Sequence, residues 1–388
     1  MELNRLIKKI SHLDITLVAG KKGLSTPVKW IHFVEAPESC SFLDGGEIVI
    51  ITGIGLNENT TISDLIISVI KANAAGAIVN IGPYIENIPE DVIAYCDEKD
   101  FPLFTIPWRI HLAELTRIFS QAIMKDEQNS IHIATAFKNA IAFPGQSEFY
   151  QVTLHSHGFK TNAQYCACCI MVSDIKGDTE QRLGTLAYEI DHFLKRTYKN
   201  YSVFVYDEQI VIIVSNYTVS EIHDFVNEAV IKTKTLLTKD ETITYGCGKI
   251  TQSIRCLYKT YNQARSIQQL QFSGKLGDQY HFYSSLGVFK LLMAINDTDV
   301  IEDYLKNTIN PLREYDQAKC TDLCEVLACY LENDCSVQKT SDMLFLHRNT
   351  VNYKIAKASE IIERDMSVLH NRVEISLAFM LESYTHSK

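Results

Sequence analysis

A short stretch near the C-terminus, residues 340–362, carries the side chains best suited to recognise another molecule. Its sequence is TSDMLFLHRNTVNYKIAKASEII. In a helix each residue is turned by about 100° from the one before it. If residues 348–362 are helical, one stripe is apolar and must pack against the rest of the domain. That stripe consists of Val351, Ile355, Ala358 and Ile362.

The remaining surface of this helix would be polar, basic and aromatic. Asn side chains pair bidentately with adenine in the major groove, and basic and hydroxyl side chains bind phosphates. Between Met343 and Ala358 there are three basic residues and no acidic one, in a chain whose formal net charge is −10. This local reversal of charge indicates binding to double-stranded DNA rather than an ordinary solvated face. The predicted DNA-binding residues are Arg348, Asn349, Thr350, Asn352, Tyr353, Lys354 and Lys357.

Two helices with a tight break between them would position this face. The apolar-periodic segments meet around Leu344 to Leu346, a break too short to be a separate functional loop. This pattern is typical of a helix-turn-helix, whose second helix reads base edges with its N-terminal turns. One such unit contacts too few bases for a specific site, so we expect a homodimer or a larger even-numbered assembly. The alternative is a scaffold whose C-terminal helices bind protein.

The same region resembles a known family. The run DLCEVLACYLENDCSVQKTSDMLFLHRNTVNYKIAKASEII is similar to the C-terminal helix-turn-helix of PucR-type (purine catabolism) transcriptional regulators, and LHRNTVNYKI is its most specific part. Family members commonly carry Arg after the Tyr, where this chain has Lys354, which can contact a phosphate but not pair bidentately with a base. The resemblance implies a ligand-responsive regulator, an activator of purine or other nitrogen-compound catabolism genes. Its effector would be a small molecule such as a purine-degradation intermediate.

Composition limits the remaining possibilities. With 388 residues, 46% of them hydrophobic and 22% charged, the chain has room for two or three soluble domains. The net acidity indicates that contact with DNA is local. No apolar run approaches the roughly 20 residues of a membrane span, and the first ten residues do not resemble a signal peptide. We therefore expect a cytoplasmic protein without membrane contact.

The eleven cysteines are interpreted as reduced thiols. Cys166 and Cys169 form a C-x-x-C, but they lie in an apolar run typical of a buried strand. Neighbours on a strand alternate between faces, so these two thiols could not share a metal. The cysteines between Cys320 and Cys335 also lack the paired spacing of a zinc site. The sequence therefore predicts neither a metal nor a cofactor.

Residues 1–125 alternate strand-like runs with helical ones, which favours a parallel α/β sheet. Within them, VKWIHFVE and GGEIVIITG resemble the N-terminal domain of PucR-type regulators. Gly45, Gly46 and Glu47 partly match a diguanylate cyclase signature, but the residues that follow do not, so we interpret them as a turn before a buried strand.

This domain is also the predicted effector site. Ligands of open α/β sheets lie beyond the carboxyl ends of the strands, and a small nitrogen-rich effector needs an aromatic wall, an acceptor and a donor. The alternative is that the Trp is a core aromatic and the Glu a solvated loop residue. The candidate side chains are Trp30, His32, Glu35, Thr52 and Gly53.

A helical linker, residues 126–147, leads to a central domain of residues 148–275. Its predicted order is strand, helix, hairpin at Asp207 and Glu208, helix, strand, helix, as in a ferredoxin-like α+β fold. The segment YGCGKITQSIRCLYKTYNQARSIQQLQ resembles the GGDEF-like domain of this regulator family. Asp174, Asp207 and Glu208 stand where a nucleotide cyclase holds Mg²⁺, and they are the only support for the alternative of a signalling cyclase or hydrolase.

The glycine pair that such an enzyme needs is replaced by Val205 and Tyr206, so we predict a degenerate, non-catalytic domain and no enzyme. Residues 276–388 complete the chain as an all-helical lead-in and the helix-turn-helix.

Overall fold

The computed structural model describes residues 1–57, 60–274, 276, 280–292, 294–295 and 297–385. The chain divides into two compact units. The first contains residues 1–167, 172–243 and 250–258, and the second contains residues 168–171, 244–249 and 259–388. Part of the predicted helical lead-in, at positions 277–279, 293 and 296, lies outside the described residues.

The N-terminal domain is built on a five-stranded sheet with the strand order β1-β5-β4-β3-β2. Strands β2 to β5 are parallel, as the alternation of strands and helices predicted, and β1 is antiparallel at the edge. The strands are β1 (Thr16–Ala19), β2 (Ile31–Phe33), β3 (Ile48–Ile51), β4 (Gly76–Ile81) and β5 (Leu103–Pro107).

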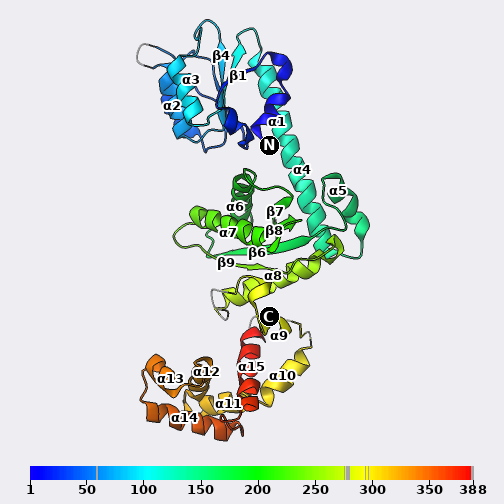
Figure 1. The fold of residues 1–388 in the computed structure, drawn as a ribbon, viewed down its shortest axis with the longest axis vertical. Helices are drawn as coiled ribbons and strands as arrows, with labels where there is room; N and C mark the ends of the chain where they lie inside the picture. Colours follow the sequence, from blue (N-terminus) through cyan, green and yellow to red (C-terminus); the bar gives the residue numbers. More distant parts are fainter. Residues whose placement is uncertain (58–59, 275, 277–279, 293, 296, 386–388) are drawn as a thin grey trace. The chain divides into compact units, whose positions relative to one another are not determined.

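Helices cover both faces of this sheet (Figure 1). Val49 and Val79 belong to the core beneath α2 and α3, whereas Ile50 and Ile78 belong to the core beneath α1 and α4. Both faces of β3 are therefore buried, which explains its continuous apolar sequence IVII. These helices are α1 (Leu3–Lys8), α2 (Ile62–Lys71), α3 (Glu90–Glu98) and α4 (Leu112–Ala142).

Helix α4 has 31 residues and contributes to two hydrophobic cores of the first unit. Near its start, Leu115 and Phe119 are fully buried in the N-terminal domain. Near its end, the ring of Phe137 packs edge-on against Phe159, with 4.9 Å between centroids, and stacks on Phe204 of the central domain. Residues 126–142 of the predicted linker therefore belong to one continuous helix, which ends before residues 143–147.

The central domain has the β-α-β-β-α-β order predicted from the sequence, and its sheet order is β7-β8-β6-β9. Asp207 and Glu208 join β7 to β8 as a two-residue turn with φ of 54° and 57°, the combination required by a type I′ hairpin. The elements are α5 (Gln151–Ser156), β6 (Tyr165–Ser173), α6 (Thr179–Leu194), β7 (Tyr201–Tyr206), β8 (Gln209–Ser215), α7 (Val219–Leu236), β9 (Thr242–Cys247) and α8 (Leu257–Phe272).

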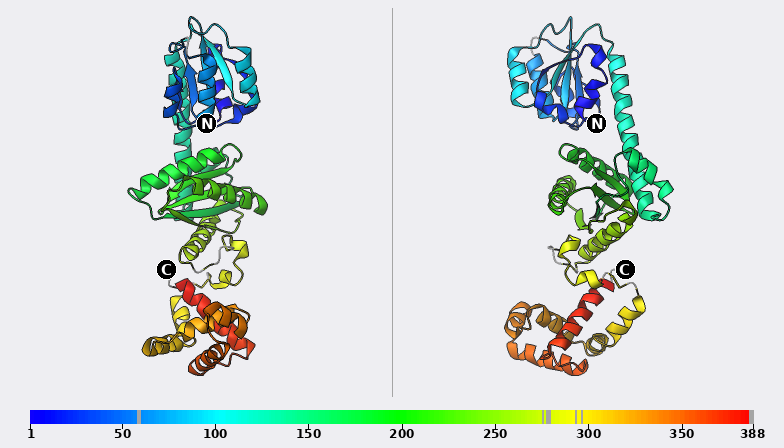
Figure 2. Two further views of the ribbon diagram at one scale, coloured as in Figure 1. Left: turned by 90° about the vertical axis from the view of Figure 1, so that its left-hand side faces the viewer. Right: turned by 45° about the vertical axis from the view of Figure 1, so that its right-hand side comes forward.

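The C-terminal part is all-helical, and its helices pack around one shared core (Figure 2). Leu312, Leu327, Val351 and Ile375 are fully buried there. No helix among the described residues is long and apolar enough to cross a membrane. The helices are α9 (Phe289–Leu292), α10 (Thr298–Lys306), α11 (Asn310–Lys319), α12 (Leu323–Glu332), α13 (Val337–Leu344), α14 (Arg348–Ile361) and α15 (Leu369–Thr385).

Candidate nucleic-acid interface and ligand-binding edge

Helix α14 has the two faces that the sequence predicted. Its apolar stripe is buried, with Val351 and Ala358 fully inaccessible and Ile355 and Ile362 nearly so. On the rest of its surface Arg348, Asn349, Asn352 and Tyr353 are exposed, whereas Thr350 is half-buried. The amide and aromatic side chains of the first two turns are therefore available to a partner.

The turn before α14 is fixed by local hydrogen bonds. Phe345 ends α13 in the left-handed conformation, with φ of 53°. The amide of Leu346 donates to the carbonyl of Ser341 at 3.0 Å, and the Ser341 hydroxyl donates to the carbonyl of Leu346 at 2.5 Å. His347 then caps α14, because its Nδ1 accepts from the amide of Asn349 at 3.2 Å. These bonds hold α13 and α14 in one relative orientation.

The basic residues of α14 differ in their partners. Lys354 is ion-paired with Asp322, just before α12, and its side chain is only 19% exposed. Lys357 is paired with Glu360 at 2.9 Å within the same helix, and Arg348 has no ion pair among the described residues. The sequence pattern could not distinguish these lysines, since Asp322 lies 32 residues before Lys354.

Phe345 was missed as a candidate contact residue in the sequence. It is 94% exposed, although it lies in the apolar run LFL. Met343 and Tyr353 are also exposed, at 62% and 69%. The helix-turn-helix therefore presents apolar side chains beside its polar ones.

In the N-terminal domain, three of the predicted effector residues form one hydrogen-bonded cluster. The carboxylate of Glu35 accepts from the amide and hydroxyl of Thr52, at 3.0 and 2.7 Å, and from the amide of Gly53 at 3.0 Å. Thr52 follows β3, and Glu35 follows β2 by two residues. The cluster therefore lies at the carboxyl ends of these parallel strands, and Glu35 is more than a solvated loop residue.

Trp30 and His32 occupy different positions. Trp30 precedes β2, and its carbonyl accepts from the amide of Ile48 at the start of β3, so it lies at the amino ends of the strands. It is 46% exposed and is therefore not a core aromatic. His32 is the middle residue of β2 and is half-buried. The structure thus separates Trp30 from the Glu35 cluster by the length of the strand.

A different aromatic pair lies near the Glu35 cluster. Gly53 has φ of +82°, and a Cβ built on it would lie 3.1 Å from the Cβ of Tyr84. The ring of Tyr84 packs against Trp108, with 5.6 Å between centroids, and both rings are partly exposed. At the end of β4, Asn80 is 2% exposed and its Oδ1 has no hydrogen-bond partner among the described residues. In the sequence these two aromatics come shortly after strand-like runs, in the segments IGPY and TIPW, and this placement could have indicated them as candidates.

The carboxylates considered for catalysis lie at strand ends of the central domain. Asp174 follows β6, and Asp207 and Glu208 form the hairpin turn. Among the described residues, no three His, Cys, Asp or Glu side chains gather in a way that could hold a metal ion.

Comparison with known proteins relates both ends of the chain to one family. Residues 6–123 match the purine catabolism regulatory protein-like family, and residues 323–381 match the PucR C-terminal helix-turn-helix domain. Both matched segments are thus assigned to domains of PucR-type regulators. The second one spans α12 to α14 and most of α15, which includes the face described above.

Curated relatives agree with this assignment. The proline-responsive transcriptional activator PutR of Bacillus subtilis (strain 168) is 26% identical over 219 residues, covering 55% of this chain and 53% of PutR. The DNA-binding transcriptional activator AdeR of the same organism is 26% identical over 37% of this chain and 34% of AdeR. The purine catabolism regulatory protein of Bacillus subtilis (strain 168) is 27% identical over 31% of this chain and 23% of that protein.

The chain spans about half the length, or less, of these curated relatives. Their names describe regulators and not enzymes, in agreement with the prediction made from the hairpin sequence. Among solved structures, a regulator of polyketide synthase expression from Bifidobacterium adolescentis aligns with 65% of this chain and 95% of its own, at 13% identity and a TM-score of 0.29. That score is too low to support an inference about fold or function.

Proposed function

We propose that this PucR-type protein is a ligand-responsive transcriptional activator that binds a DNA operator through α14. The observation that carries the proposal is the exposed first half of α14, presented by a turn that hydrogen bonds fix in place. Asn349 is suited to a base edge, and Arg348, Thr350 and Lys357 are suited to phosphates, with Asn352 and Tyr353 completing the surface. Lys354 would support this surface through its ion pair with Asp322.

The regulated genes, in this proposal, serve purine or other nitrogen-compound catabolism. Support comes from the names of the relatives, which refer to proline response and to purine catabolism. The effector would be a small nitrogen-containing molecule, either a purine-degradation intermediate or an amino acid. The DNA-bound form would be a homodimer or larger even-numbered assembly in the cytoplasm, because two-fold protein symmetry suits paired half-sites.

The effector is proposed to bind at the carboxyl edge of the N-terminal sheet. Glu35 shapes the turn at Thr52 and Gly53 there, and Tyr84 and Trp108 supply the aromatic surface that was first sought at Trp30. His32, in the middle of β2, and Trp30, just before this strand, remain candidates. The buried Oδ1 of Asn80, which has no hydrogen-bond partner among the described residues, suits a ligand N–H.

The central domain is proposed to be a GGDEF-like scaffold without catalysis. Val205 and Tyr206, which precede the hairpin turn, have side chains where a cyclase requires glycine for the nucleotide to approach. Purified protein is expected to leave nucleoside triphosphates unchanged in the presence of Mg²⁺. Turnover that disappears in Asp174→Asn would instead establish the enzymatic alternative.

DNA binding is tested by sequencing genomic fragments that the purified full chain retains, then measuring affinity for a recovered fragment and for random DNA. We expect a preference for the recovered site and an affinity for both that falls as salt rises from 50 to 200 mM. Light scattering of the complex should show an even number of chains. Absence of salt-sensitive DNA affinity would favour the protein-binding alternative, and a monomer on the operator would contradict the proposed assembly.

A further inference from the structure

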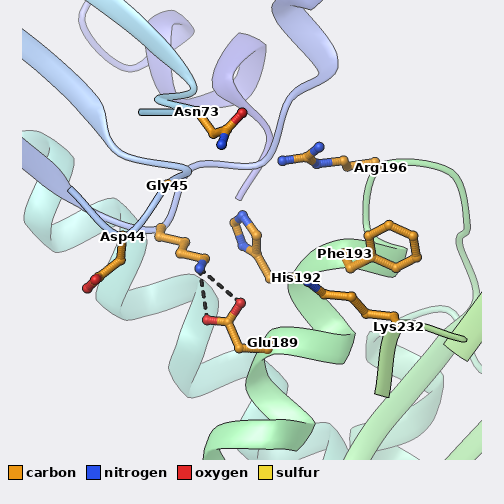
Figure 3. Close-up of a pocket in the computed structure, with 9 residues that line it drawn as sticks. Asp44, Gly45, Asn73, Glu189, His192, Phe193, Arg196 and Lys232 are labelled. Atoms are coloured by element: carbon orange, nitrogen blue, oxygen red, sulfur yellow. Dashed lines mark hydrogen bonds and ion pairs between the residues drawn. The ribbon is translucent and has the colours of Figure 1, made fainter. Parts of the chain in front are cut away.

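A second candidate site lies within the first compact unit, where α6 approaches the turn before β3 (Figure 3). The cavity has a volume of about 210 Å³, which suits a molecule smaller than a typical drug. The side chains that matter for its chemistry are Lys29 of the N-terminal domain, Glu189 and His192 of α6, Arg196 just after α6, and Lys232 of α7.

His192 is the buried polar group of this cavity. The residue is 9% exposed, and its Nε2 has no hydrogen-bond partner among the described residues. The backbone at Gly46, with φ of +89°, approaches so closely that an added Cβ would lie 2.9 Å from this nitrogen. Figure 3 shows the imidazole near Gly45 on one side and Arg196 on the other. A buried polar atom without a partner costs free energy, and a bound ligand would remove that cost.

The charges around the imidazole favour an anion. Lys29 already has a partner, because its ammonium donates hydrogen bonds to both carboxylate oxygens of Glu189, at 2.8 and 3.1 Å. Arg196 is exposed and has no ion pair among the described residues, and Figure 3 shows its guanidinium extending toward His192. Lys232 has its ammonium 5.7 Å from the ring centre of Phe193. With Asp44 included, the lining carries three cations and two carboxylates, a local excess of positive charge in an acidic chain.

Neutral imidazole is compatible with this arrangement. Burial, together with the charges of Lys29, the amino terminus, Arg196 and Lys195, lowers the pKa of His192 to about 3. The ring is therefore uncharged at pH 7, and in its Nε2–H form it has one donor that no described residue accepts. A guanidinium fork beside such a donor matches the two oxygens of a carboxylate or phosphate.

We propose that this cavity binds a small oxyanion, a carboxylate-bearing metabolite or phosphate, between the fork of Arg196, the ammonium of Lys232 and the Nε2–H of His192. Such a ligand would contact α6 and the turn at Asp44 and Gly45 together, and would strengthen the junction between the N-terminal and central domains. The site is separate from the proposed effector edge and from α14. It does not depend on the DNA-binding function.

The test uses the full chain without DNA, and the chloride concentration is adjusted so that the ionic strength stays constant. Calorimetry and thermal melting are measured with inorganic phosphate, with succinate, and with uncharged succinamide as the control. We expect saturable binding and a higher melting temperature for phosphate or succinate, and no response to succinamide. The anion that binds more tightly identifies the source of the oxyanion.

Matched variants locate the binding. Arg196→Gln should weaken binding of that anion at least about tenfold, because a charge-assisted bidentate contact is lost. Arg117→Gln removes the same charge from an exposed position on α4, and its affinity for the anion should stay within about twofold of the wild-type value. Lys232→Gln, on a different helix, should also weaken binding and covers the case in which Arg196→Gln folds poorly.

A site-specific signal completes the test. The imidazole ¹⁵N resonances of His192, assigned by their loss in His192→Gln, should shift as the anion is added. Absence of saturable binding by both anions would overturn the proposal, as would equal effects of Arg196→Gln and Arg117→Gln. Because no DNA is present, a negative result here leaves the proposed regulatory function intact, and loss of DNA binding elsewhere leaves this site intact.

Discussion

Lys354 of α14 and Asp322, the residue before α12, form an ion pair that joins the recognition helix to its supporting helix. The sequence placed Lys354 beside Lys357 as a phosphate contact, but the pair turns its ammonium back into the domain. The side chains of Lys354 and Asp322 are 19% and 45% exposed, so the pair is partly screened by solvent. Its main consequence is to fix the orientation of α14 on α12.

The first prediction concerns the stability of this helical domain. Asp322→Ala and Lys354→Ala should each lower its free energy of unfolding by about 1 kcal/mol or less, as expected for a partly exposed pair. The free energy of unfolding lost in the double variant should be smaller than the sum of the two single losses, because each single change already breaks the pair. Chemical denaturation of the four proteins measures this coupling. Strictly additive losses would mean that the pair contributes nothing in solution.

The second prediction concerns Lys357, whose partner Glu360 can be exchanged for a phosphate without rearranging the core. Lys357→Ala should weaken binding to operator and random DNA alike and flatten the slope of log affinity against log salt by about one. Lys71→Ala, on α2 of the N-terminal domain, is the matched control and should leave the slope unchanged. A selective loss of operator affinity would assign Lys357 to base recognition instead.

The third prediction concerns sequence preference. Asn349 lies in the first turn of α14 with an exposed side chain, so Asn349→Ala should reduce discrimination between operator and random DNA by about 1 to 3 kcal/mol. Non-specific affinity should hardly change, since an amide carries no charge. Asn262→Ala, an exposed position on α8, serves as the control. Equal losses on both DNAs would show that Asn349 does not read a base.

Local patterns predicted much of the fold because they depend on near neighbours in the sequence. The helical period identified the buried stripe of α14, and the two polar residues between apolar runs identified the hairpin at Asp207 and Glu208. Each of these features depends only on residues within one or two helical turns or within one pair of neighbouring strands.

The contacts that were missed join distant parts of the chain. Lys354 and Asp322 are 32 residues apart, and Lys29 and Glu189 are 160 apart, so no spacing rule connects them. Trp30 was grouped with Glu35 because they are close in sequence, yet a strand carries them to opposite ends of the sheet. Trp108 follows another strand, β5, and was therefore not considered.

The fourth prediction concerns the turn at the carboxyl edge of the N-terminal sheet. Glu35→Gln replaces one acceptor oxygen by an amide that faces N–H donors, so at least one of three hydrogen bonds is lost. The free energy of unfolding should fall by about 1 to 2 kcal/mol. If the effector binds here, its affinity for the full chain should fall as well, which calorimetry measures. Unchanged effector binding in a destabilised variant would give Glu35 a purely structural role.

The fifth prediction concerns acid sensitivity and follows from the lowered pKa of His192. In the unfolded chain this histidine should titrate near its ordinary pKa of about 6.5, whereas in the folded protein burial and the neighbouring cations keep it neutral down to about pH 3. Between these values the unfolded state binds more protons, so the free energy of unfolding falls as pH falls through this window. From pH 7 to pH 5 this contribution amounts to at most about 2 kcal/mol.

The test measures the free energy of unfolding of three proteins at pH 7 and pH 5: the wild type, His192→Gln and the exposed control His12→Gln. For each protein the change between the two pH values is compared, so differences in absolute stability do not matter. The wild type and His12→Gln should lose the same amount on acidification, and His192→Gln should lose about 1 to 2 kcal/mol less. Few carboxylates titrate above pH 5, so they contribute little to this difference. An identical loss in all three proteins would show that His192 is not held neutral, and that the cavity at the end of α6 is more open to water than its geometry indicates.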